Sequence, residues 1–75
     1  MGEATMNQLI SMCNKVGWDA GIAALEKIVL ANEHLQADLF ANPETVKDAQ
    51  RLSKTIIKQS ITIGNLKRIR KELGI

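Results

Sequence analysis

The chain has 75 residues, with ten cations, eight acids and a net charge of +2. A chain this short forms one domain, so we predict a single helical domain over residues 1–75, with residues 1–4 disordered. Aromatic residues make up 3% of the chain and hydrophobic residues 45%, so the core must be aliphatic. Cys13 is the only cysteine, which excludes an intrachain disulfide and is typical of a reducing compartment.

Membrane association is not expected from the sequence. No apolar run approaches the ~18 residues that a membrane span needs. The first residues lack the basic region and the apolar stretch of a signal peptide. We therefore expect a cytoplasmic protein that has no membrane partner.

The first predicted element is a short helix over about residues 5–16. Its apolar residues recur at helical spacing: Met6, Leu9, Ile10, Cys13 and Val16. Gly17 follows the last of them, where a capping glycine is expected. Asp19 is then the expected N-cap of a second helix over about residues 19–41.

The tripeptide Asn42-Pro43-Glu44 predicts the start of a third helix, over about residues 43–63. Asparagine is a good N-cap, proline is preset for the first turn, and the acid complements the positive end of the helix dipole. Two long helices joined by so short a connection should fold back as an antiparallel hairpin. The fold class is therefore all-α.

The end of the third helix is harder to place. Ile61, Thr62 and Ile63 favour a strand on propensity, but no second segment offers such a strand a partner. Along a helix, Leu66, Ile69 and Leu73 fall about 100° away from the preceding apolar face. We predict a break at Gly64-Asn65, as a kink or as a short basic helix over about residues 65–73.

A strip of four cations follows one side of the third predicted helix: Lys47, Arg51, Lys54 and Lys58. One interpretation is that the strip forms internal salt bridges, Glu33 with Arg51 and Glu26 with Lys58 across the hairpin. Helical phase favours the other interpretation, because the strip lies nearly opposite the apolar face and should point outward. There it would meet solvent, phosphates or an acidic partner.

The C-terminal segment carries a second group of four cations: Lys67, Arg68, Arg70 and Lys71. One interpretation is structural, since cations in a last turn are favoured by the helix dipole and Gly74 is a natural stop. The alternatives are a helix that contacts phosphates and a surface for an acidic partner or a membrane.

Residues suited to catalysis or metal binding are few. His34 is the only histidine, so it and Cys13 cannot supply a four-ligand zinc site. A nucleophilic pair of these two is conceivable, but Cys13 lies on an apolar stripe, as a core residue would. We expect no enzymatic activity, catalytic residue, metal, cofactor or small-molecule substrate.

The sequence thus favours a non-enzymatic helical protein–protein interaction or regulatory module. We expect it to self-associate and to bind a protein partner, because a short aliphatic chain without a disulfide needs to bury additional apolar surface. The predicted interface residues are Leu25, Ile28, Asn32, Leu35, Leu39, Leu52, Ile56 and Ile63. The alternative is a nucleic-acid-binding regulator that contacts phosphates through the two cation groups.

Overall fold

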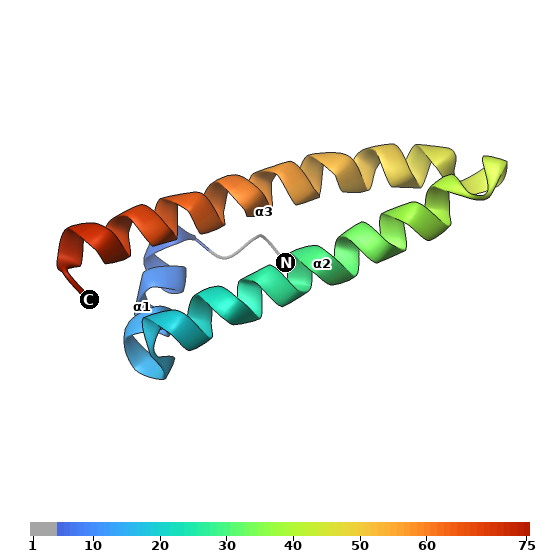
Figure 1. Cartoon of the computed structure of the whole chain (residues 1–75). Helices are drawn as coiled ribbons and strands as arrows, with labels where there is room; N and C mark the ends of the chain where they lie inside the picture. Colours follow the sequence, from blue (N-terminus) through green and yellow to red (C-terminus); the bar gives the residue numbers. More distant parts are fainter. Residues whose placement is uncertain (1–4) are drawn as a thin grey trace.

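A computed structural model describes residues 5–75, so the disorder predicted for residues 1–4 lies outside the described range. The elements are α1 (Met6–Val16), α2 (Trp18–Phe40), the short 3-10 helix η1 (Pro43–Thr45) and α3 (Val46–Leu73). Residues 5–75 contain no strand, and the predicted all-α class is confirmed. Figure 1 shows α2 and α3 running side by side in opposite directions, with α1 at the open end of this hairpin.

Local side-chain chemistry explains where α1 begins and ends. Thr5 and Gln8 form a capping box. The backbone N–H of Gln8 donates to Thr5 Oγ1 at 3.2 Å, and the backbone N–H of Thr5 donates to the side-chain Oε1 of Gln8 at 2.8 Å. Gly17 then turns the chain with a φ of +97°, which disfavours residues with a Cβ. Helix α2 follows at once, so Asp19 lies in its first turn and is not the N-cap that we predicted.

The turn between the long helices begins as the sequence predicts. Asn42 Oδ1 accepts a hydrogen bond from the Glu44 amide at 3.0 Å. Pro43 opens the 3-10 turn, and α3 begins three residues later than predicted, at Val46. The Thr45 hydroxyl donates to the Leu39 carbonyl at 2.6 Å, which ties the turn back to α2.

The separate basic helix predicted over about residues 65–73 is wrong, because α3 is one continuous helix from Val46 to Leu73. The shift of the apolar face is nevertheless present in the structure. Leu66 is fully buried in a cluster with Cys13 of α1, and Ile69 packs against that cluster. The face therefore turns toward α1 because a third helix packs there, and the backbone of α3 does not need to bend.

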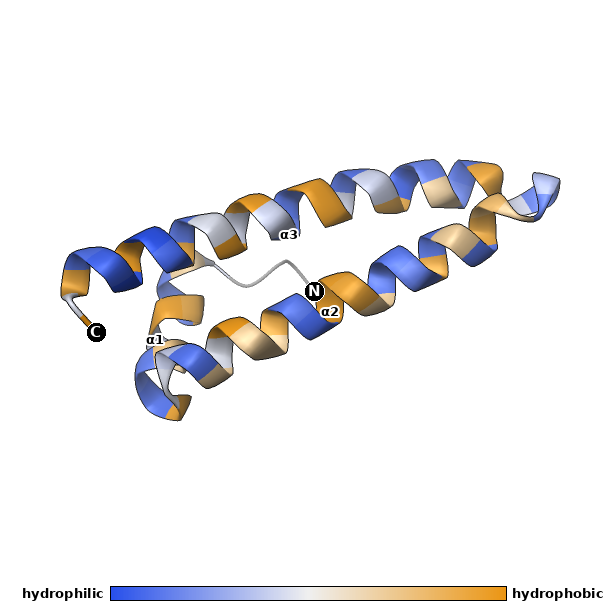
Figure 2. Cartoon of the chain, viewed as in Figure 1, coloured by the Kyte–Doolittle hydropathy of each residue, from blue (hydrophilic) through white to orange (hydrophobic). Residues whose placement is uncertain are grey.

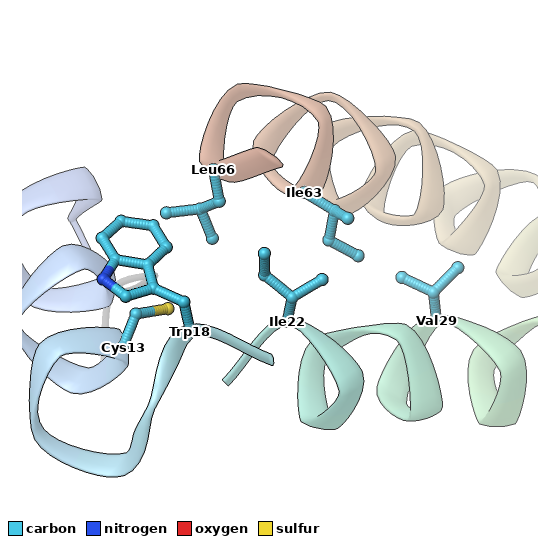
Figure 3. Packing of buried hydrophobic residues seen from close by; sticks show 6 residues of the cluster. All are labelled: Cys13, Trp18, Ile22, Val29, Ile63 and Leu66. Atoms are coloured by element: carbon cyan, nitrogen blue, oxygen red, sulfur yellow. The ribbon is translucent and has the colours of Figure 1, made fainter. Parts of the chain in front are cut away.

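The buried apolar residues gather at the open end of the hairpin. Figure 3 shows Leu66 over Trp18, and Ile63 facing Ile22 and Val29. Trp18 Nε1 donates to Asn14 Oδ1 at 3.0 Å, so its one polar group is paired although the ring is buried. We call this end, where α1 packs, the basal half of the hairpin, and the end at η1 the distal half.

The contact between α1 and α2 requires a glycine at position 21. A Cβ on Gly21 would lie 2.8 Å from Cys13 Sγ and 3.3 Å from Cys13 Cα. The second distance involves backbone, which cannot rotate away. Gly21 thus lets α1 approach α2 closely enough to bury Cys13 completely.

Gly21, which contacts α1, and Gly64, which is exposed on α3, give a matched pair of predictions. Gly21→Ala should lower the free energy of unfolding by about 1 to 3 kcal/mol through overpacking against Cys13. Gly64→Ala should raise it by up to about 1 kcal/mol, because Gly64 is exposed in a helix interior and has open space around it. Chemical denaturation monitored by circular dichroism measures both. Equal effects of the two substitutions would contradict the close contact at Gly21.

Candidate interaction surfaces

The hairpin has two faces, and a groove follows the junction of α2 and α3 on each. The first groove, of about 260 Å³, lies on the face that α1 covers, which we call the α1 face. Its lining residues are Leu9, Leu25, Ile28, Thr55, Lys58, Gln59, Thr62 and Ile63. Leu9 belongs to α1, so this groove marks where the cover by α1 ends.

The second groove, of about 590 Å³, is larger in volume and lies on the opposite face. Its lining residues are Ala23, Glu26, Lys27, Val29, Leu30, Glu33, Ser60 and Ile63. Acidic and basic side chains rim this groove, whereas Thr55, Lys58 and Gln59 line the first, so apolar and polar side chains mix in both. Leu30 is 56% exposed beside it, and sequence analysis did not single out this residue.

The structure separates the predicted interface residues into two groups. Ile63 is buried, and Leu25 and Ile56 pack against the core, so these three stabilise the folded chain itself. Ile28 and Leu35 are each 49% exposed. Both lie on one stripe of α2, since they are seven residues apart, and Leu39 and Leu52 are half-buried toward the turn.

Polar side chains join the two long helices in the distal half. Asn32 Nδ2 donates to Gln59 Oε1 at 3.0 Å, and Gln36 Nε2 donates to Ser53 Oγ and to the Ala49 carbonyl. The predicted interface residue Asn32 is thus paired inside one chain. Its hydrogen bond fixes the register of the hairpin, and the apolar stripe beside it provides the exposed surface.

The strip of Lys47, Arg51, Lys54 and Lys58 is exposed along its whole length. The internal pairs with Glu33 and Glu26, which helical phase disfavoured, are absent from the salt bridges of residues 5–75, and Arg51 instead approaches Asp48 on its own helix at 3.8 Å. Opposed residues also follow another register. The residue numbers of opposed positions sum to 89 for Gln36 and Ser53 and to 91 for Asn32 and Gln59. The pairs of Glu33 with Arg51 and Glu26 with Lys58 would both require a sum of 84. The sum is larger because η1 lengthens the connection.

Two of the four C-terminal cations bridge the hairpin. Lys67 Nζ lies 3.8 Å from Glu26 Oε1, and Arg70 forms an ion pair with Asp19. Arg70 Nε also donates to the Ile75 carbonyl at 3.0 Å. Arg68 and Lys71 are exposed and form no salt bridge within residues 5–75.

Cys13 and His34 lie apart in the structure. Cys13 packs against Gly21, whereas His34 is 13 residues further along α2, a distance of about 20 Å. Burial raises the pKa of the Cys13 thiol, which disfavours the reactive thiolate. The described residues hold no group of three or more side chains suited to a metal ion, and none of their helices is long and apolar enough to cross a bilayer.

Comparison with known protein families, curated proteins and solved structures finds no match to this chain. Its function is therefore inferred from the exposed surfaces that the fold creates.

The two kinds of C-terminal cation should respond differently to charge reversal. Arg70→Glu places an acid against Asp19 and should lower stability by about 0.5 to 1 kcal/mol, the scale of a partly exposed ion pair. Arg68→Glu, two positions away, is the matched control and should change stability by less. Thermal unfolding at low and high salt measures both, and the difference between the variants should shrink as salt is added.

Proposed function

We propose that this chain is a non-enzymatic protein–protein interaction module that self-associates through the exposed apolar stripe of α2 on the α1 face. The observation that carries the proposal is the uneven burial along the hairpin. The core cluster of Cys13, Trp18, Ile22, Val29, Ile63 and Leu66 lies in the basal half. In the distal half the only buried residue among those described is Ala49.

The shape of the chain supports the same proposal. Its radius of gyration is 14.3 Å, whereas a compact domain of this length has about 11 Å. It exposes 5621 Å², whereas a compact monomer of 8.3 kDa exposes about 4,600 Å². The excess of about 1,000 Å² is close to the surface that one partner covers in a standard protein interface.

The distal half therefore has the character of an incomplete bundle. Ile28 and Leu35 are half exposed, and the polar contacts between Gln36 and Ser53 contribute little hydrophobic burial. A partner that covers the stripe would add the apolar area that this half lacks. Each fully buried Leu or Ile contributes about 1.5 to 3 kcal/mol, and this gain opposes the entropic cost of association.

Substitution of Leu35 tests this proposal. Leu35→Glu should weaken self-association by at least about 30-fold, because a charge replaces an apolar residue at the centre of the contact. Sedimentation velocity or light scattering across a concentration series measures the effect. Circular dichroism should show that the isolated chain stays helical, since Leu35 lies outside the core cluster.

Leu30→Glu is the matched control. It changes the same residue type in the same helix at similar exposure, 56% against 49%, but beside the groove of the opposite face. It should leave self-association intact. If the unaltered chain is monomeric at high micromolar concentration, or if only Leu30→Glu disrupts the assembly, the proposed surface is wrong.

A second candidate function is binding to the phosphate backbone of nucleic acid through the strip of Lys47, Arg51, Lys54 and Lys58. The exposure of all four side chains along one side of α3 favours it. Their spacing of four, three and four residues gives a strip about 17 Å long. Backbone contacts of this kind need no base readout and depend strongly on salt.

Titration of a fluorescent duplex with the unaltered chain tests this candidate. The affinity should fall with salt, with a slope of log affinity against log salt of about −0.9 for each phosphate neutralised. Arg51→Glu with Lys54→Glu should abolish binding, whereas Arg68→Glu with Lys71→Glu tests whether the C-terminal cations take part. If the unaltered chain does not bind the duplex at about 50 mM salt, neither cation group is a nucleic-acid-binding surface, because charges are only weakly screened at this salt concentration.

A further inference from the structure

The position of α1 limits how a second copy can dock on the hairpin. Helix α1 has 11 residues and a length of about 16 Å, whereas α3 has 28 residues and a length of about 42 Å. Cys13 and Leu9 place α1 over the basal half of the α1 face. Among residues 5–75, nothing packs over the distal half of that face (Figure 1).

An exposed apolar stripe runs along α2 and continues into its uncovered part. Ala24, Ile28, Ala31 and Leu35 are spaced four, three and four residues apart, which places them on one side of the helix, and all four are exposed. Figure 2 shows hydrophobic bands along this part of α2. Such spacing is the pattern of a helix–helix packing seam. Because this stripe is separate from the seam that faces α3, α2 has apolar surface for a second helix.

Resting on the self-association proposed above, the geometry points to an antiparallel, two-fold symmetric dimer in which the distal halves of two hairpins pack face to face on the α1 face. The occupant of the stripe is a second copy of this chain. In this arrangement α2 lies over α2 of the second copy, near Leu35, and α3 lies over its counterpart. The two α1 helices lie outside the overlap, at opposite ends of the resulting four-helix bundle.

The alternative two-fold arrangement is a parallel one, with both turns at the same end. It would place both α1 helices at one end and on the same face, between the two hairpins. Packed helices lie about 8 to 10 Å apart, so two intervening helices would hold the stripes out of contact. Helix α1 therefore acts as a spacer that selects the antiparallel arrangement.

The size of the overlap agrees with this assignment. Residues 28–40 of α2 extend about 18 Å beyond the end of α1. The chain has about 1,000 Å² of surface in excess of a compact monomer, which is what one partner of a standard dimer covers. An isologous contact uses the same patch on both copies, and small residues can then face large ones. With the axis near Leu35, Ala31 of one copy opposes Leu39 of the other.

Distances between equivalent labels distinguish the two arrangements. Spin labels at His34→Cys and Asn42→Cys, in separate variants, report a position near the two-fold axis and one far from it. Both sites are exposed, whereas Cys13 is fully buried and does not compete for the label. In the antiparallel dimer, the Asn42 labels should lie more than about 10 Å farther apart than the His34 labels.

Electron–electron distance measurements on each labelled variant provide the readout. In a parallel dimer the two label separations would be equal within a few ångströms, because equivalent residues keep a constant distance along the bundle. That result would overturn the antiparallel arrangement. It would leave the proposed self-association standing. A monomeric mass for both labelled variants and for the unaltered chain overturns the inference and the proposed function together. Retention of the dimer in Leu35→Glu would also overturn the inference, because Leu35 lies at the axis.

Discussion

The close approach of Cys13 to Gly21 sets the position of α1, and much of the structure depends on that contact. Because Gly21 has no side chain, α1 can bury Cys13 completely. Helix α1 then provides a second packing surface for α3, and Leu66 becomes fully buried against it. The apolar face of α3 therefore changes direction along a helix that remains continuous. Two antiparallel helices alone would have left this surface open to water.

Local chemistry allowed the turn of the hairpin to be predicted, because the cap at Asn42 and the preset φ of Pro43 are properties of adjacent residues. The apparent break at Gly64 could not be interpreted in the same way. Periodicity shows that a buried face shifts, but it does not show whether the backbone bends or a third helix packs there. Gly21 carried a signal that was missed, since a glycine inside an apolar helical stripe often marks a close approach of two backbones.

The candidate sites were predictable to different degrees. The outward orientation of the basic strip follows from helical phase alone, and the structure agrees with it. The pairing of Glu26 depends on register between two helices, which the length and shape of the turn determine. Because η1 adds a 3-10 turn, Glu26 meets Lys67 instead of Lys58. The same dependence on tertiary packing explains why Ile63 belongs to the core of the chain, while Leu35 stays exposed.

The polar contacts of the distal half and its exposed stripe have complementary roles. Hydrogen bonds such as Asn32 with Gln59 are directional, so they hold α2 and α3 in one register with little apolar burial. Aliphatic side chains, whose contacts are not directional, remain on the outside of the same helix.

In the antiparallel dimer, α3 would lie over its counterpart, so the cation strips of both copies would occupy one edge of the bundle. Lys58 lines the groove of the α1 face itself, so this edge would adjoin the dimer contact. Self-association and binding of a polyanion would then be linked, because each copy would supply half of one continuous basic surface.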